Sequence, residues 1–299
     1  MEESAGPRRQ GTLIRGIGSF YTVRTPEGET YTLRCQKKIR RQHMTPLPGD
    51  EVLFTPGEGE RHGWLEEILP RKTECLRPPV ANITQMILVM APVPEPDLLL
   101  ADRLMALACA QGIRVIIAVN KSDLDPGMAD RIRREYAGAE TTVYPVSATE
   151  GAGLDPLKEA MRGELNCLAG QSGVGKSSLL NAMLGLELET GDISRKIERG
   201  KNTTRHVELI EKAGIRVMDT AGFSLLEAEH RMPPETLKER YPEFRPYEGK
   251  CRFRECLHDR EPGCAVGEAA AAGQISAGRL DRYRQLLRET RESWRERYD

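Results

Sequence analysis

The feature that most constrains the fold of this chain is a glycine-rich segment, GQSGVGKS, at residues 170–177. It matches the pattern G-x-x-x-x-G-K-S, in which a strand is joined to a helix by a turn whose backbone N–H groups surround phosphates. The apolar residues 165–169 predict that strand, and residues 177–184 have the periodicity of a buried helix that begins near Lys176. The segment therefore predicts an α/β domain that binds a nucleoside triphosphate.

The loop supplies most of the predicted phosphate contacts. Lys176 is expected on the β- and γ-phosphates and Ser177 on a Mg²⁺ ion, as in other loops of this type. The helix that follows adds the positive end of its dipole. The predicted nucleotide-binding residues of the loop are Gly170, Gln171, Ser172, Gly173, Val174, Gly175, Lys176, Ser177 and Ser178.

Length, composition and charge limit what surrounds the loop. The 299 residues are enough for two or three domains of about 100–200 residues each. No apolar run approaches the ~20 residues of a membrane helix, and the first residues do not resemble a signal peptide, so we expect a soluble protein of the cytosol. The net charge of −1 argues neither for nor against a nucleic-acid partner.

Short strands with turn signals fill residues 11–69 and predict a small five-stranded β-barrel of the OB type. Such barrels bind oligonucleotides on one face. A basic stretch at residues 37–43 is either a contact for nucleic-acid phosphates or a solvated turn. Aromatic residues on the strands are either stacking platforms for bases or part of the barrel core. The basic residues are Lys37, Lys38, Arg40 and Arg41, and the aromatic ones are Tyr21, Tyr31 and Phe54.

From residue 85 onward the pattern alternates between apolar strands and amphipathic helices. Alternation with continuous apolar strands predicts a mostly parallel sheet covered on both faces. The predicted strands span residues 85–91, 113–120, 141–147 and 165–169, and the predicted helices span residues 97–111, 128–136 and 154–162.

Two strand ends carry motifs suited to a guanine base, NKSD at residues 120–123 and SAT at residues 147–149. Ligands of α/β sheets bind just beyond the carboxyl ends of strands. The Asp123 carboxylate can accept both N–H groups of guanine's Watson–Crick edge, whereas adenine offers no such pair. Asn120 is expected on the ring edge and Lys121 along the base plane. The remaining predicted base contacts are Ser147 and Ala148.

Two segments after the loop predict switches that respond to the γ-phosphate. A polar stretch at residues 191–202 ends in Thr203 and Thr204, one of which is expected to ligate Mg²⁺, and we assign this role to Thr204. DTAG follows at residues 219–222, where Asp219 is expected to hold Mg²⁺ through water and Gly222 to donate its N–H to the γ-phosphate. Such segments are ordered by triphosphate and released on hydrolysis. The predicted catalytic residues are Lys176, Thr204, Asp219 and Gly222.

Four potential metal ligands lie within fourteen positions near the C-terminus. Three thiols and one imidazole form a tetrahedral donor set that zinc prefers, and a closed set of four indicates a structural site. The alternatives are a redox pair or unrelated surface cysteines. Nearby arginines are either contacts for RNA phosphates or a solvated face. The ligands are Cys251, Cys256, His258 and Cys264, and the arginines are Arg252, Arg254 and Arg260.

The order of the nucleotide motifs is unusual, because NKSD and SAT precede the phosphate loop. A typical GTPase places them last, and a circular permutation explains the change while preserving the site. In this order, and with the barrel and the cysteine cluster, nearly the whole chain resembles the circularly permuted GTPases of the RsgA (YjeQ) family. The resemblance implies a multidomain fold with an OB-fold β-barrel at residues 1–72, a permuted α/β P-loop GTPase domain at 73–230 and an α-helical zinc-binding domain at 231–299.

The resemblance also implies a function. It predicts a GTP phosphohydrolase that binds the 30S ribosomal subunit and its 16S rRNA, acts in late maturation of that subunit and is stimulated by it. The expected cofactors are GTP or GDP, Mg²⁺ and one structural Zn²⁺. A cytoplasmic monomer without membrane attachment is expected. The alternatives are an RNA-binding regulator that uses GTP and GDP as a switch with little turnover, and an ATP-dependent enzyme, against which NKSD argues.

The group that positions the attacking water is not evident from the motifs. Ras-like GTPases place glutamine directly after DxxG, but here that position is Phe223. Members of the family often carry histidine just before the paired threonines, where this chain has Asn202, and His206 follows two residues beyond Thr204. We therefore expect slow hydrolysis by the isolated protein and a water-positioning group supplied by the ribosomal subunit.

Overall fold

The computed structural model describes residues 7–36, 38–39, 44–57, 62–76, 79–188, 207–219 and 232–296. The chain divides into two compact units. One comprises residues 1–84, 161–168 and 193–223, and the other comprises residues 85–160, 169–192 and 224–299. The domain boundaries expected after residues 72 and 230 stay predictions.

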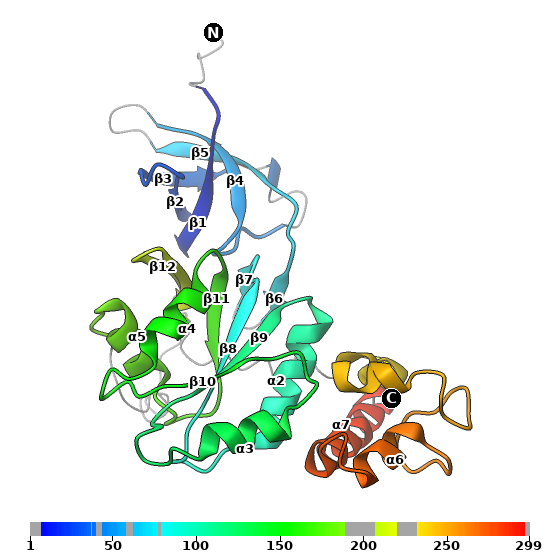
Figure 1. The fold of residues 1–299 in the computed structure, drawn as a ribbon. Helices are drawn as coiled ribbons and strands as arrows, with labels where there is room; N and C mark the ends of the chain where they lie inside the picture. The colour runs from blue at the N-terminus through cyan, green and yellow to red at the C-terminus, as the bar shows by residue number, and fades with distance from the viewer. Residues whose placement is uncertain are drawn as a thin grey trace. The chain divides into compact units, whose positions relative to one another are not determined.

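The N-terminal part of the first unit is a closed five-stranded barrel with the strand order β1-β2-β3-β5-β4, which confirms the predicted barrel (Figure 1). The pairs are antiparallel except for β3 with β5, which run parallel. A hairpin of two short strands, β6 and β7, follows the barrel. The strands are β1 (Arg9–Ile17), β2 (Phe20–Arg24), β3 (Thr30–Cys35), β4 (Glu51–Thr55), β5 (Gly63–Ile68), β6 (Glu74–Leu76) and β7 (Pro79–Ala81).

The barrel closes because alternate side chains of its strands point inward and exclude water. Phe54 has no exposed surface and lies in the core, and Tyr21 and Tyr31 pack against that core while remaining partly exposed. Of the two alternatives given for the aromatic residues, Phe54 therefore belongs to the barrel core. A stacking role for its ring is wrong because no base can reach it. The rest of the core comprises Leu13, Val23, Leu33, Cys35, Ile39, Val52, Leu65 and Ile68.

The predicted sheet is present and has six strands in the order β10-β9-β8-β11-β13-β12. The pairs β10–β9, β8–β9 and β11–β13 are parallel, and β12 with β13 forms an antiparallel hairpin. Every residue of β8 and of β11 is buried, as expected for strands covered on both faces. The strands are β8 (Gln85–Met90), β9 (Arg114–Val119), β10 (Val143–Pro145), β11 (Leu165–Ala169), β12 (Glu208–Lys212) and β13 (Ile215–Asp219).

Helices connect the strands of the second unit, and Figure 1 shows α4 and α5 on one side of its strands and α2 on the other. The Asp97 carboxylate caps α2 by accepting from the Leu100 backbone N–H, which fixes where that helix begins. The predicted helices are all found, with ends that differ by one residue at most. The helices are α2 (Leu98–Ala110), α3 (Met128–Glu135), α4 (Leu154–Met161) and α5 (Lys176–Leu184).

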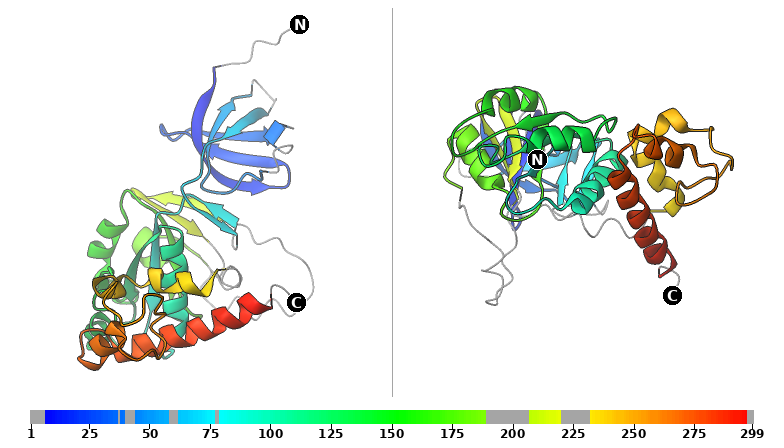
Figure 2. Two further views of the ribbon diagram at one scale, coloured as in Figure 1. Left: turned by 90° about the vertical axis from the view of Figure 1, so that its right-hand side faces the viewer. Right: turned by 60° about the horizontal axis from the view of Figure 1, so that its bottom comes forward.

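The C-terminal region of the second unit is helical, and Figure 2 shows its long last helix from two further sides. Its core is aromatic: Tyr241 stacks on Phe244, and Tyr283 meets both rings edge-on at 4.9 and 5.0 Å. The Ser276 hydroxyl accepts from the Arg279 N–H and thereby caps the start of the last helix. The elements are η4 (Pro234–Arg240), η5 (Pro242–Tyr247), α6 (Ala265–Ala271) and α7 (Ala277–Arg295).

Among the described residues, α7 included, the structure contains no helix with the length and apolar character needed to cross a membrane.

Candidate nucleotide site and metal centre

The phosphate loop lies between β11 and α5, where the sequence places it. Its glycines have backbone conformations that other residues rarely adopt: φ is 132° at Gly170, 80° at Gly173 and 91° at Gly175. Space excludes a side chain as well, because a Cβ on Gly170 would lie 2.2 Å from the Val89 carbonyl oxygen. These glycines therefore allow a backbone course that larger residues would block.

Lys176 is the first residue of α5, and its side chain turns back into the loop. Its Nζ donates to the carbonyl oxygens of Gly170 and Gln171, each at 2.8 Å. Burial lowers the pKa of Lys176 below its ordinary value. The loop thus holds an ammonium group that is partly removed from water, where the negative charge of a phosphate would stabilise it.

Asn120 links three motifs that are far apart in the sequence. Its side chain is 1% exposed, its Nδ2 donates to the Val174 carbonyl oxygen at 2.9 Å, and its Oδ1 accepts from the Ala148 N–H at 3.1 Å. NKSD, SAT and the phosphate loop therefore meet at one amide group. The structure assigns Asn120 a bracing role that sequence reasoning missed, and its expected contact with the guanine ring edge stays a prediction.

The other residues of the base motifs lie around this brace. Lys121 has a positive φ of 57°, and its Nζ donates to the carbonyl oxygens of Val93 at 2.7 Å and Gly173 at 2.9 Å. Its side chain thus lies across the phosphate loop. The Asp123 side chain is exposed, whereas Ser147 is buried and its hydroxyl accepts from the Glu150 N–H.

Gln171 connects the phosphate loop to the start of α2. Its Oε1 accepts from the Asp97 backbone N–H at 2.9 Å, and its Nε2 donates to the Glu95 carbonyl oxygen at 3.0 Å. The sequence predicts Gln171 only as a nucleotide-binding residue of the phosphate loop. Nothing in the motif indicates that its side chain would also bind the backbone at residues 95 and 97.

Several predicted residues lie outside the described part of the chain. They are Asn202, Thr203, Thr204, His206, Gly222 and Phe223 of the switch segments, and Lys37, Arg40 and Arg41 of the basic stretch. Asp219 is the last residue of β13, and Lys38 is exposed. The catalytic and Mg²⁺-binding roles assigned to Thr204, Asp219 and Gly222 stay predictions.

The described loop fits a nucleoside triphosphate with Mg²⁺ by its chemistry. The turn has no room for a side chain at Gly170 or Gly175, and it leads into the N-terminus of α5. Backbone N–H groups at a helix N-terminus are available to an anion. Lys176 would meet phosphate, and the Ser177 hydroxyl would bind the metal. Mg²⁺ supplies positive charge that stabilises the negative charge of the phosphates.

The four predicted zinc ligands do come together. Their ligand atoms all lie within 4.8 Å of one another, and His258 Nδ1 lies 3.7, 3.6 and 3.4 Å from the sulfurs of Cys251, Cys256 and Cys264. A tetrahedral zinc site with ordinary bond lengths places nitrogen and sulfur ligands about 3.6 Å apart. The cluster therefore fits one structural Zn²⁺, and His258 presents Nδ1 to it.

The surroundings of the cluster stabilise its loop. Burial raises the pKa of the Cys256 thiol to about 12 and also raises the pKa of Cys264. Without a metal, charged thiolates are therefore unfavourable here, and a bound Zn²⁺ would reverse that preference. Lys238 Nζ donates to the Cys256 carbonyl oxygen at 3.0 Å, and the Tyr283 hydroxyl donates to that of Leu257 at 2.6 Å.

Surfaces suited to nucleic acid occur on both the barrel and the zinc loop. On the barrel, the Arg34 guanidinium lies 5.0 Å from the centre of the Phe20 ring, and Arg34 pairs in register with Trp64, which is 47% exposed. Sequence reasoning missed Trp64, although its alternation with buried Gly63 and Leu65 could have identified it. On the zinc loop, the exposed arginines are Arg252, Arg254 and Arg260.

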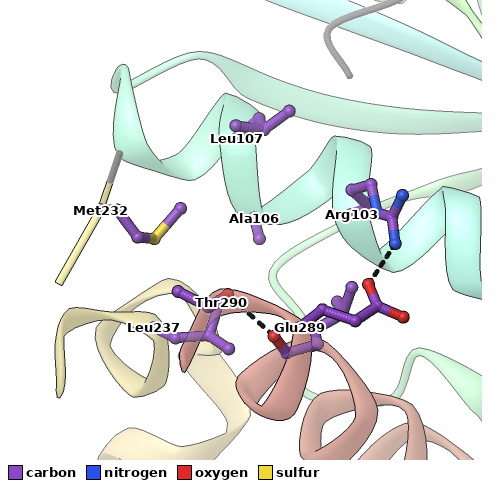
Figure 3. Close-up of a pocket in the computed structure, with 8 residues that line it drawn as sticks. Arg103, Ala106, Leu107, Met232, Leu237, Glu289 and Thr290 are labelled. Carbon is purple, nitrogen blue, oxygen red and sulfur yellow. Dashed lines mark hydrogen bonds and ion pairs between the residues drawn. The ribbon is translucent and has the colours of Figure 1, made fainter. Parts of the chain in front are cut away.

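A small cavity lies between α2 and the C-terminal region (Figure 3). Its volume of about 50 Å³ is enough for a few water molecules and far too small for a nucleotide. An ion pair between Arg103 and Glu289 lies at its edge. The lining residues are Arg103, Ala106, Leu107, Met232, Leu237, Leu286, Glu289 and Thr290.

Together, the loop, the base motifs and their order define a P-loop nucleoside triphosphatase of the permuted GTPase type. Comparison with known proteins agrees. A family model described as RsgA GTPase matches residues 68–229, and one described as RsgA N-terminal domain matches residues 10–65. The chain belongs to the RsgA GTPase family and is a GTP hydrolase that uses GTP, GDP and Mg²⁺.

The relatives and solved structures cover nearly the whole chain. The chain is similar to "Small ribosomal subunit biogenesis GTPase RsgA" of Ruminiclostridium cellulolyticum, 44% identical over 93% of this chain and 92% of the relative. The protein of that name from Geobacillus thermodenitrificans is 45% identical over 95% and 98%. The crystal structure of YjeQ from Thermotoga maritima has a TM-score of 0.82 at 33% identity, covering 95% of this chain and 99% of that one. YloQ, described as a circularly permuted GTPase, has a TM-score of 0.79 at 32% identity, covering 98% of each chain.

Proposed function

We propose that this protein hydrolyses GTP while bound to the small (30S) ribosomal subunit and acts in the late maturation of that subunit. The observation that carries the proposal is the full-length similarity to relatives named small ribosomal subunit biogenesis GTPases. That similarity spans the barrel, the nucleotide motifs and the zinc ligands. It therefore includes the barrel and the zinc region, which are the parts that we expect to contact the subunit.

Contact with 16S rRNA is assigned to the two surfaces described above. Aromatic rings that reach the surface beside a cation bind unpaired bases by stacking, which favours the barrel surface formed by the exposed Trp64, the partly exposed Phe20 and Arg34. Exposed arginines on a loop shaped by zinc are suited to phosphates. The protein is proposed to act as a cytoplasmic monomer without membrane attachment.

The residue roles in hydrolysis are proposed from the motifs and the described geometry. Lys176 binds the β- and γ-phosphates, Ser177 and Thr204 ligate Mg²⁺, Asp219 holds Mg²⁺ through water, and Gly222 contacts the γ-phosphate. The guanine base is bound by Asn120, Lys121, Asp123, Ser147 and Ala148. No glutamine follows DTAG, so the subunit supplies the group that positions water and thereby stimulates turnover.

The test is GTP hydrolysis under multiple-turnover conditions with purified 30S subunits, with 50S subunits as the matched control. We expect 30S particles to raise the turnover number at least tenfold and 50S particles to leave it unchanged. Equal rates with both particles would disprove stimulation by the small subunit. Tight binding to 30S particles with little turnover would instead support the RNA-binding switch.

A further inference from the structure

Arg279 is a fully buried arginine in the first turn of α7. Its side chain is 2% exposed, although arginine is almost never buried without partners. Asp102 on α2 and Glu243 on η5 both pair with it, the former at 2.6 Å from Nη1, and neither carboxylate is more than 2% exposed. Burial alone would lower the pKa of Arg279, but these carboxylates outweigh it and raise the pKa above its ordinary value.

Two aromatic rings complete this site. The Arg279 guanidinium carbon lies 4.8 Å from the ring centres of both Tyr136 and Tyr241, a distance at which a cation is attracted to a ring face. The Tyr136 hydroxyl donates to the same Asp102 oxygen at 2.9 Å. The planar guanidinium therefore has a defined orientation, which a lysine ammonium would not reproduce.

The next turn of α7 extends the same network to α3. Arg282 pairs with the second oxygen of Asp102 at 2.6 Å and with Glu135 at 2.7 Å. The Ser276 hydroxyl, which caps α7, donates to the other oxygen of Glu135 at 2.8 Å. The start of α7 is thus joined by hydrogen-bonded ion pairs to α2, and by an ion pair and the Ser276 hydrogen bond to α3.

Both of these helices begin at loops of the nucleotide site. Asp102 lies five residues after Asp97, about 7.5 Å along a stiff helix. The Asp97 N–H is held by Gln171 of the phosphate loop. The chain enters α3 from NKSD, where Lys121 donates to the phosphate loop at Gly173. A displacement of α7 would therefore move the segments that hold the loop.

We propose that Arg279 is a positioning residue of the nucleotide site, which acts through Asp102 and α2 on Gln171 and the phosphate loop. The inference rests on the proposed nucleotide site and goes beyond it by making the C-terminal zinc region a regulator of nucleotide affinity. Coupling between two sites is reciprocal, so nucleotide binding must in turn stabilise the start of α7. A ligand of the zinc region would alter GTP and GDP affinity by this route.

The test uses the full-length zinc-loaded protein and the variant Arg279→Lys, which keeps the charge and loses the planar fork. The matched control is Arg288→Lys, which changes an exposed arginine on the same helix. Zinc content and circular dichroism report whether each variant is folded. Dissociation constants for GDP and for a non-hydrolysable GTP analogue are measured with fluorescent nucleotides.

We expect Arg279→Lys to retain one zinc per chain and normal helix content while at least one of the two dissociation constants rises fivefold or more. Arg288→Lys is expected to stay within twofold of the wild type. A folded Arg279→Lys protein with both constants within twofold of the wild type would overturn the proposal. Failure of the wild type to bind either nucleotide would instead overturn the proposed nucleotide site itself.

A second measurement decides the matter if Arg279→Lys does not fold. Hydrogen–deuterium exchange of the wild-type protein is compared with and without GDP. The expected result is slower exchange of the amides of residues 280–284 at the start of α7, with residues 290–295 of the same helix as the internal control. Unchanged exchange at residues 280–284 on saturation with GDP would contradict the coupling.

Discussion

Replacing Gly175 with alanine tests whether the Asn120 brace is needed for nucleotide binding. A Cβ at this position would lie 2.4 Å from Asn120 Nδ2, far inside van der Waals contact. Asn120 is not free to move aside, because its side chain is buried and both of its polar atoms are hydrogen-bonded. The substitution therefore acts on the brace by displacing Asn120, while every side chain that is predicted to touch the base stays present.

The cost has two parts. Gly175 has φ of 91°, and holding an alanine in a left-handed conformation costs about 1–2 kcal/mol. Displacing Asn120 removes two hydrogen bonds, each contributing about 1 kcal/mol. The sum is about 3–4 kcal/mol if the loop must keep its native shape. Without nucleotide the phosphate loop can relax around the new methyl group, whereas with nucleotide bound it must keep its native shape. Most of the ~3–4 kcal/mol therefore reduces the free energy of nucleotide binding, which weakens affinity roughly 100- to 1000-fold.

Gly163 provides a matched control. It too has a positive φ, of 76°, but nothing lies within 4 Å of a Cβ placed there. Gly163→Ala therefore introduces similar backbone strain without a clash. Fluorescent GDP titration and thermal unfolding are measured for both variants. We expect both to unfold at a lower temperature and only Gly175→Ala to lose affinity. Equal affinity in the two variants, or a Gly175→Ala affinity within threefold of the wild type, would refute the bracing argument.

Three further predictions concern the metal, the barrel surface and the barrel core. The three cysteine ligands bind zinc as thiolates, and burial raises the pKa of Cys256 and Cys264. Near neutral pH each of the three thiols therefore loses a proton on binding zinc, and the affinity should fall roughly 1000-fold per unit decrease in pH between pH 7.5 and 6.5, as measured by chelator competition. A tenfold change would show that only one proton is released. Trp64→Ala should weaken binding to 30S subunits or single-stranded RNA by about 1–3 kcal/mol, whereas Trp64→Phe, which keeps an aromatic ring, should retain most of the wild-type binding free energy. An equal loss of binding in both variants would exclude stacking. Phe54→Ala should destabilise the barrel by about 3–5 kcal/mol in denaturant unfolding, and a loss under 1 kcal/mol would contradict its placement in the core.

Features that depend on local spacing could be predicted from the sequence. The phosphate loop follows from glycine, lysine and serine at fixed intervals between an apolar strand and a helix, and β11 and α5 lie there. The zinc cluster follows from four ligands within fourteen residues. The barrel and the permuted order of the motifs could also be predicted, because each strand and each motif has its own short local pattern.

Features that join distant segments could not be predicted in this way. Asn120 meets Val174 across 54 residues, Gln171 meets Asp97 across 74, and Arg279 meets Asp102 across 177. Helical periodicity places Arg279 on the same face of α7 as Tyr283 and Leu286, but it does not identify the distant carboxylates that allow an arginine to be buried there. Burial of a charge depends on which partners the fold supplies, and those partners lie on α2 and η5, far from α7 in the sequence.

The circular permutation changes the connection of the chain after β13 but keeps the contacts that join the nucleotide motifs. Asn120 still bonds to the phosphate loop and to SAT, although it now precedes both in the chain. After Asp219 the chain continues through residues 220–231 to η4 of the C-terminal region instead of returning to the sheet. Within the second unit, that region contacts α2 through the ion pair between Arg279 on α7 and Asp102. The zinc region is therefore joined to the rest of the second unit in two ways, by the chain that follows Asp219 and by the ion pairs of Arg279 and Arg282 with α2 and α3. The coupling that we propose for Arg279 uses the second of these connections.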